Sequence, residues 1–370
     1  MSSWFAPVYF EDHTFGQLSK WIAEYDPSII YLLVDENTHE HCAPLILRAL
    51  DIPQRIELIE IPAGEEQKTI DIAIHIWSAL TELNTDRKAL MINVGGGVIC
   101  DLGGFVAACF KRGIAYVNVP TTLLAMVDAA HGSKTGVDFE GLKNQIGLFN
   151  PPKATFVHDG FCQTLSKREF TAGFAECVKH ALIADKELWH AFLLNGQPDP
   201  DLIGHYIEPS IEIKKQVVES DPLEEGRRKI LNFGHTVGHA IESFFLEHAV
   251  TPLLHGEAVA MGLIAELYIS SRTCGLSEAE LLIATDYIKA VFPIYRIPER
   301  NFDALIRLME QDKKNDGGLI NFTLISEPGT SIVNFNTDEI TLIESLAFIN
   351  QHANQPTVEF KPSGSSATSI

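Results

Sequence analysis

The stretch that decides the fold is Asn93–Asp101, which reads NVGGGVICD: a short apolar run, three consecutive glycines and the start of a helical pattern. Gly95, Gly96 and Gly97 would let backbone N–H groups approach a pyrophosphate at a helix N-terminus. The run is not the GxGxxG fingerprint, and a glycine triplet also suits a plain tight turn. The stretch therefore predicts a strand–turn–helix unit and leaves nucleotide binding open.

Similar units flank this stretch. Strands are predicted at 28–34, 55–61, 89–94, 115–119 and 154–158, with helices at 71–83 and 99–110. Strands that alternate with helices indicate a parallel sheet covered on both faces. From Lys167 onward the spacing favours helices, at 167–184, 200–219, 235–246, 257–273, 277–291 and 302–311, with extended segments at 320–325 and 331–334.

The predicted fold class is thus an α/β Rossmann-like domain with a parallel sheet, followed by a mainly α-helical domain. We expect the first domain over residues 1–160 and the second over 161–354. The polar, Ser/Gly-rich residues 355–370 are expected to form a frayed tail.

Composition narrows the class of partner. The 370 residues hold 28 Lys and Arg against 49 Asp and Glu, a net charge of −21, which argues against nucleic acid as a partner. No apolar run reaches the roughly 18 residues of a membrane span, and no secretory signal is visible. The six cysteines lie far apart, mostly in apolar runs, as in a reduced cytoplasmic protein. We therefore expect a small-molecule partner, and an anionic one would need local Lys and Arg.

Polar side chains follow two predicted strands. Asp35 and Asn37 come after the first, and Thr121 and Thr122 come after the fourth. Groups at the carboxyl ends of parallel strands meet at one edge of the sheet, where acidic residues often bind ribose hydroxyls. These residues strengthen the nucleotide interpretation of the glycine turn.

Histidines mark a candidate metal site. His235 and His239, in NFGHTVGH, are four residues apart and hence on one face of a helix, and His255 opens the next helix. This spacing predicts that His235 and His239 both bind a metal such as Zn²⁺, although such histidines also cap helices. Glu176 and Lys179 share a face of another helix, where a surface ion pair is the simpler interpretation.

Cations also recur beside Gly, Asn or His. In so acidic a chain, their convergence on a cleft would suit a phosphate and a carboxylate, whereas singly each fits a solvated surface. They are Arg112, Lys134, Lys143, Lys179, Lys214, Arg228, Lys313 and Lys314.

Six segments then occur in a fixed order: GGGVICDLGGF, FKRGIAYVNVPTTLLAMVDAAHGSKTGVDFEGLKNQIG, TLSKREFTAGFAECVKHALI, RRKILNFGHTVGHAIE, LLHGEAVAMG and QDKKNDGG. Over residues 28–330 the chain resembles the 3-dehydroquinate synthases of the sugar-phosphate cyclase superfamily. The resemblance implies conversion of 3-deoxy-D-arabino-heptulosonate 7-phosphate to 3-dehydroquinate and phosphate, in the shikimate route to aromatic amino acids. It also implies that NAD⁺ takes a hydride and returns it, that Zn²⁺ (or Co²⁺) acts as a Lewis acid, and that the enzyme is a phosphate-eliminating lyase.

The resemblance assigns roles residue by residue. The implied metal ligands are Glu176, His235 and His255, with His239 in the substrate pocket, against the prediction from spacing. The implied NAD site comprises Asp35, Asn37, Glu65, Lys68, Gly95, Gly96, Gly97, Val98, Asp101, Thr121, Thr122, Lys134, Lys143, Phe161 and Thr164. The implied substrate contacts are Arg112, Asp128, Lys134, Asn144, Lys179, Lys214, Arg228, Asn232, His239 and Lys314, of which Lys134, Lys179, Lys214, Arg228, Asn232 and His239 would be catalytic. Arg112 is expected to reach in from a neighbouring subunit, which implies a homodimer.

One segment departs from the family pattern. The usual run Ser-Ser-Val-Gly-Gly-Lys-Thr is here Ala129–Thr135, AAHGSKT, so that His131 and Ser133 are unusual. Ser133 would crowd a loop that needs a positive φ. The change is either neutral drift or a sign of altered substrate choice. Asn232, His239 and Lys314 match the dehydroquinate type.

Three alternatives remain. A related cyclase would act on sedoheptulose 7-phosphate or glucose 6-phosphate. A metal-dependent polyol dehydrogenase would release NADH and need no lysine cluster. A nucleotide-binding regulator without activity would have lost metal ligands, and all three candidates are present.

Overall fold

The computed structural model describes residues 4–140, 142–311 and 320–361. The chain forms two compact units, one of Met1–Gly173 with Asp199–Pro222 and one of Phe174–Pro198 with Leu223–Ile370. Residues 161–173 and 199–222 thus cluster with the first unit, whereas the sequence placed the division at residue 160. The assignment of NAD and substrate to separate domains stays a prediction.

The first unit is built on a six-stranded parallel sheet. Its order is β1-β8-β5-β4-β2-β3, and its strands are β1 (Val8–Phe10), β2 (Ile30–Asp35), β3 (Ile56–Ile61), β4 (Leu90–Gly95), β5 (Ala115–Pro120) and β8 (Thr155–Val157). Every residue of β4 and of β5 is buried, as expected for strands covered on both faces. The predicted strands and the parallel sheet are confirmed.

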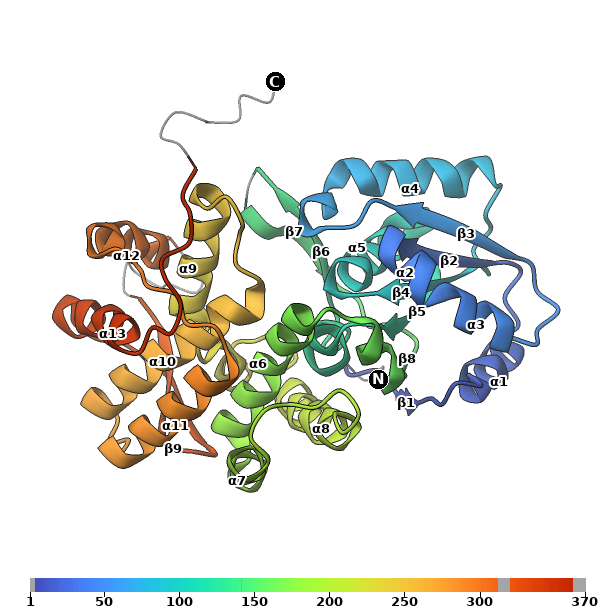
Figure 1. Cartoon of the computed structure of the whole chain (residues 1–370). Helices are drawn as coiled ribbons and strands as arrows, with labels where there is room; N and C mark the ends of the chain where they lie inside the picture. Colours follow the sequence, from blue (N-terminus) through green and yellow to red (C-terminus); the bar gives the residue numbers. More distant parts are fainter. Residues whose placement is uncertain (1–3, 141, 312–319, 362–370) are drawn as a thin grey trace. The chain divides into compact units, whose positions relative to one another are not determined.

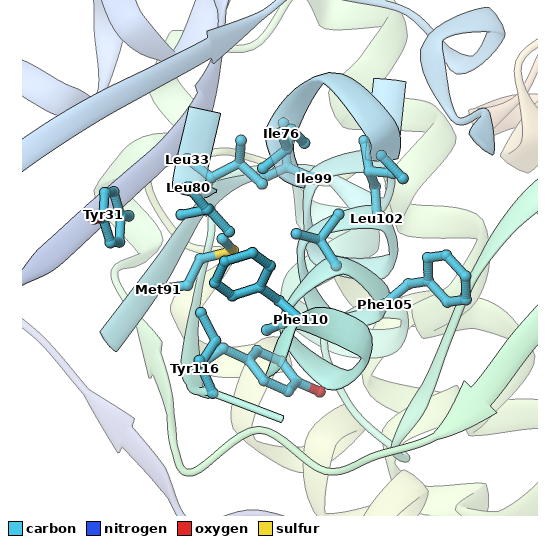
Figure 2. Close-up of a cluster of buried hydrophobic side chains, with 14 of the residues drawn as sticks. Tyr31, Leu33, Ile76, Leu80, Met91, Ile99, Leu102, Phe105, Phe110 and Tyr116 are labelled. Atoms are coloured by element: carbon cyan, nitrogen blue, oxygen red, sulfur yellow. The ribbon is translucent and has the colours of Figure 1, made fainter. Parts of the chain in front are cut away.

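A continuous apolar cluster covers one face of this sheet. It joins Leu33 and Met91 of the strands to Ile99 and Leu102 of α5 (Gly97–Cys109) and Ile76 of α4 (Ile70–Glu82) (Figure 2). Burial of this apolar surface fixes α5 against the sheet and so sets the position of the glycine turn that precedes it.

The order of the strands creates a topological switch point. The chain adds β3 on one side of β2 and then returns to add β4 on the other side. At the carboxyl ends of β2 and β4 the connections therefore leave in opposite directions, which opens the crevice where ligands bind in such folds.

Further elements complete the first unit (Figure 1). A two-stranded hairpin, β6 (Lys134–Phe139) and β7 (Leu142–Phe149), lies apart from the main sheet. The helices are α1 (Gly16–Tyr25), α2 (Glu36–His41), α3 (Ala43–Ala49) and α8 (Gly204–Ser220), and α6 (Lys167–Ala184) begins here.

The second unit is mainly helical, as predicted. Its central helix is α10 (His255–Thr273), which is buried from Gly256 to Ser270 and packs against α9, α11 and α13. The other elements are α7 (Lys186–Asn195), α9 (His235–His248), α11 (Glu278–Val291), α12 (Phe302–Glu310), α13 (Glu339–Gln351) and the hairpin β9 (Phe322–Glu327) and β10 (Thr330–Phe335). Within the described part of the chain, no helix is both long and apolar enough to cross a membrane.

Candidate active site

The switch point brings the glycine turn and Asp35 to the same edge of the sheet. Asp35 ends β2 and caps α2, since its carboxylate accepts a hydrogen bond of 2.8 Å from the Thr38 amide. Gly95 ends β4, and Gly96 is the N-cap of α5 without any side-chain cap. The Thr121 amide donates to the Gly95 carbonyl at 3.0 Å, which joins the ends of β4 and β5.

Space beside the glycine turn is limited. A Cβ atom on Gly96 would lie 3.1 Å from Cγ2 of Thr122, and one on Gly97 would lie 3.3 Å from Cβ of Ala129. The N-terminus of α5 therefore offers backbone N–H groups where a side chain would crowd the turn. This arrangement fits the pyrophosphate of a dinucleotide.

Two ion pairs join four of the residues predicted for NAD. Lys68 Nζ lies 2.7 Å from Oδ2 of Asp101, and Lys143 Nζ lies 3.4 Å from Oε1 of Glu65. Burial lowers the pKa of Lys68, but the Asp101, Glu65 and Asp138 carboxylates together outweigh that effect, and the pKa is raised. Burial raises the pKa of Asp101, and Lys68 opposes that shift. Lys68 is thus a fixed, charged group.

The remaining residues predicted for NAD have different surroundings. The Phe161 ring is buried against Phe15 and His158, so it belongs to the core. The Thr164 hydroxyl donates to the Phe161 carbonyl at 2.8 Å, and Asn37 is exposed on α2. Val98 is half-buried in the first turn of α5.

Several predicted substrate residues also lie in the first unit. Lys214 of α8 is buried, and its Nζ donates to Oδ1 of Asp128 at 2.8 Å and to the Asp128 carbonyl at 2.5 Å. Lys134 and Asn144 are exposed on the hairpin, and Arg112 is exposed. Of these, the structure joins Lys214 and Asp128 directly.

The predicted metal ligands of the second unit converge. Glu176 comes from α6, and His235 and His255 are the first residues of α9 and α10. Nε2 of His235 lies 3.4 Å, and Nε2 of His255 lies 3.5 Å, from the same oxygen, Oε1 of Glu176. Two imidazoles and a carboxylate are the donor set of many catalytic zinc sites.

Hydrogen bonds prepare both imidazoles for a metal. Nδ1 of His235 lies 3.1 Å from the Phe233 carbonyl, and Nδ1 of His255 lies 3.1 Å from Oε2 of Glu242. A carbonyl oxygen only accepts, so Nδ1 of His235 carries the proton and its Nε2 keeps a lone pair. Such partners fix the orientation of ligating histidines. The residues present therefore fit a metal ion such as Zn²⁺.

His239 lies beside this set. Its ring centroid is 5.1 Å from that of His235 and 5.7 Å from that of His255. The three histidines also place ligand atoms within 4.8 Å of one another. This position is compatible both with the ligand role predicted from spacing and with the pocket role implied by the resemblance.

Buried charged groups shift the pKa values of both histidines in this centre. Lys179 contacts the Glu176 carboxylate, and both side chains are buried, so the pair is not the surface ion pair considered from the sequence. Burial, together with Lys179, lowers the pKa of His235 well below its usual value. Burial also lowers the pKa of His255, but the Glu242 and Glu176 carboxylates together outweigh that effect and raise it to about 10.

Other predicted residues of the second unit lie near polar partners or outside the described chain. Asn232 Nδ2 donates to Oε1 of Glu224 at 3.0 Å, and Arg228 is buried. Lys314, a predicted substrate contact, lies outside the described residues, as does Lys313.

Sequence reasoning missed the carboxylates that support the histidines. Glu242 follows His235 by seven residues, and Glu266 follows His255 by eleven, so each shares a helical face with a histidine. These spacings indicate that both carboxylates point toward the same side of their helices as the histidines. The apolar residues around both glutamates obscure that pattern in the sequence.

A Rossmann-like sheet with a glycine turn at its switch point, together with a His and Glu centre, is typical of enzymes that combine a dinucleotide with a metal ion. The model of the 3-dehydroquinate synthase N-terminal domain matches residues 58–172, and that of the C-terminal domain matches residues 173–315. The chain belongs to the 3-dehydroquinate synthase family.

Individual relatives agree with this membership. A 3-dehydroquinate synthase of Parabacteroides distasonis is 40% identical over 341 residues, which cover 91% of this chain and 95% of the relative. A 3-dehydroquinate synthase of Bacillus cereus is 35% identical over 340 residues, which cover 90% of this chain and 92% of the relative. A solved 2-epi-5-epi-valiolone synthase of Streptomyces hygroscopicus, with NAD⁺ and Zn²⁺ bound, has a TM-score of 0.82 at 24% identity and covers 94% of this chain and 97% of its own, which indicates a shared fold.

Proposed function

We propose that the protein is a phosphate-eliminating lyase that converts 3-deoxy-D-arabino-heptulosonate 7-phosphate to 3-dehydroquinate and phosphate. Membership of the family supports the activity. The observation that carries the proposal is the convergence of His235 and His255 on one oxygen of Glu176, because it supplies the metal donor set that the reaction needs.

Two cofactors fit the residues present. Glu176, His235 and His255 would hold Zn²⁺ or Co²⁺, and the α5 N-terminus with Asp35 would hold NAD. When bound, NAD would accept and later return a hydride while the metal ion acts as a Lewis acid at the alcohol being oxidised. The 2-epi-5-epi-valiolone synthase structure, which contains NAD⁺ and Zn²⁺, supports the choice of these two cofactors.

The chain's own residues would bind and orient the substrate. Lys214, fixed by Asp128, presents a cation at a set position, and Arg228 is a second buried cation. Lys134, Asn144, Asn232 and Lys314 would add contacts to the two anionic ends of the substrate. Contacts to both ends would limit the conformations of the bound sugar and so lower the entropic part of the barrier.

Lys179 has a separate role in this proposal. Its ammonium contacts Glu176 and, together with burial, lowers the pKa of His235. It would also stabilise negative charge that develops on substrate oxygens near the metal. His239, beside the other histidines, would act on the substrate as a hydrogen-bonding or proton-transfer group.

Assembly and location complete the proposal. We infer a homodimer in which Arg112, exposed in this chain, reaches the site of a neighbouring subunit. Four of the six cysteines are buried, which suits a reducing, cytoplasmic setting.

One assay separates the proposed function from its alternatives. The protein, supplied with NAD⁺ and Zn²⁺, is offered the heptulosonate 7-phosphate, sedoheptulose 7-phosphate and glucose 6-phosphate, and phosphate release is followed. We expect release from the first alone. Release from either of the other two would indicate a different cyclase, and NADH formed in step with product would indicate a dehydrogenase.

A further inference from the structure

One fully buried carboxylate holds the start of the helix that carries His235. Glu266 lies on α10 with 0% of its surface exposed. Its Oε2 accepts a hydrogen bond of 2.6 Å from the Gly234 amide, and its Oε1 accepts bonds of 3.1 and 3.2 Å from the Thr236 and Val237 amides.

These bonds replace a local cap. The N-cap of α9 is Gly234, which has no side chain and a φ of 78°. The first N–H groups of a helix have no partner within it, and a buried helix end needs one. Glu266 supplies it from another helix, and its negative charge lies at the positive end of the α9 dipole.

The helices are also too close to shift freely. A Cβ atom on Gly262 would lie 2.0 Å from the Gly234 carbonyl oxygen and 2.7 Å from the Gly238 amide nitrogen. The backbone of α9 therefore rests directly on α10, one turn before Glu266. The carboxylate and this close contact fix both the distance and the rotation of the start of α9.

His235 lies between the bonded amides. Glu266 holds the residue before it and the residue after it, while His255 opens the helix on which Glu266 itself lies. We propose that Glu266 is a positioning residue for the metal centre, which sets Nε2 of His235 against Nε2 of His255 and Oε1 of Glu176. The inference rests on the metal role of His235 in the proposed function.

The chemistry requires a carboxylate of this length. Glu266 meets three donors with two acceptor oxygens. In Glu266→Gln one oxygen becomes an NH₂ group, which faces backbone N–H groups and can accept from none. In Glu266→Asp the acceptors remain but are one methylene shorter. We expect Glu266→Gln to weaken Zn²⁺ binding about 10- to 100-fold, the usual range for loss of a supporting partner, and Glu266→Asp to weaken it less.

Zn²⁺ affinity is measured by competition with a chromophoric chelator on the whole chain, and the visible absorption of the Co²⁺-loaded protein reports ligand geometry. The matched control is Asp338→Ala, which removes another carboxylate that caps a helix of the second unit. Asp338 is the N-cap of α13, and its Oδ1 accepts a hydrogen bond of 2.7 Å from the Thr341 amide. It should lower the melting temperature and leave Zn²⁺ affinity and the Co²⁺ spectrum unchanged.

Hydrogen exchange of wild-type, metal-free protein gives a readout that needs no variant. We expect slow exchange at the Thr236 and Val237 amides. Fast exchange there, wild-type Zn²⁺ affinity in Glu266→Gln, or equal weakening in Asp338→Ala would overturn the proposal. Wild-type protein that bound no Zn²⁺ would overturn it together with the metal role of His235. Normal Zn²⁺ binding without cyclase activity would refute only the proposed function.

Discussion

The segment Ala129–Thr135, in which His131 and Ser133 depart from the family pattern, is the place to measure how well the site tolerates change. Ser133 has a φ of 67°, in the left-handed region where a serine is strained. Its hydroxyl donates to the Trp4 carbonyl. Nε2 of His131 donates to the Met126 carbonyl at 2.7 Å, and its ring stacks on Phe5 with centroids 5.3 Å apart. Both unusual residues are therefore built into contacts with the N-terminal segment or the preceding turn.

These contacts set the cost of restoring the family residues, His131→Val with Ser133→Gly. In Ser133→Gly, the glycine relieves about 1–2 kcal/mol of strain from the left-handed backbone, and loss of the Ser133 hydrogen bond costs about 0.5–1.5 kcal/mol. These two effects on stability nearly cancel. Valine loses about 0.5–1.5 kcal/mol of ring stacking and leaves a buried carbonyl without its donor, a further cost of about 1–3 kcal/mol. We expect the double variant to be less stable by about 2–4 kcal/mol, nearly all of it from His131.

Activity should change far less than stability, because other bonds hold the next residue, Lys134. It pairs with Phe149 in the hairpin, and the Asn150 amide donates to the Ser133 carbonyl at 2.7 Å. Backbone bonds survive both substitutions. We expect kcat/KM to change by less than about tenfold, or 1.4 kcal/mol, with the preferred substrate unchanged.

The assay measures kcat/KM for the heptulosonate 7-phosphate and for sedoheptulose 7-phosphate, and urea unfolding of the parent, both single variants and the double variant. Ser133→Gly alone is the control and should be close to neutral in stability. A parent that prefers sedoheptulose 7-phosphate, or a double variant that switches preference, would refute the reasoning and make the loop a specificity element.

Three further predictions concern the two cofactors and one buried ion pair. Chelation should abolish activity and added Zn²⁺ or Co²⁺ should restore it, as measured by phosphate release; full activity of metal-free protein would contradict the metal role of Glu176, His235 and His255. Catalytic NAD should support many turnovers with no net absorbance from NADH, whereas NADH equal to product would place the protein among dehydrogenases. Lys68→Met should destabilise the fold by about 3 kcal/mol in urea unfolding, because it leaves Asp101 uncompensated, and adding Asp101→Asn should recover part of that loss; a neutral single variant would show that the pair contributes nothing.

Much of the fold could be predicted because long periodic segments carry their own signal. The apolar runs of β4 and β5 and the 18-residue helix α6 lie where the pattern placed them. The three-residue β1 is too short to show a period, and it exists because β8 offers it a partner. The β6–β7 hairpin was missed because its Lys, Gly and Asn residues have a loop-like composition, while its pairing is set by neighbours in space.

The candidate site likewise has one part that the sequence pattern predicts and another that depends on contacts between distant residues. The sequence pattern alone marked His235 and His239 on one helical face and His255 at the start of the next helix. The resemblance added Glu176 as a ligand and favoured His255 over His239. The pairing of Lys68 with Asp101 spans 33 residues, and that of Lys214 with Asp128 spans 86. Such separations hold no periodic signal, since each pair forms only when folding has brought two distant segments together.

These pairings also explain how so acidic a chain can present cations to an anion. Lys68, Lys179 and Lys214 are each buried and each held by a carboxylate, from Asp101, Glu176 and Asp128. An unpaired buried ammonium would lose its proton or move to solvent, so the carboxylate keeps the lysine both charged and in place. The excess of acidic residues is thus compatible with anion binding, because part of it fixes the cations that NAD or the substrate would contact.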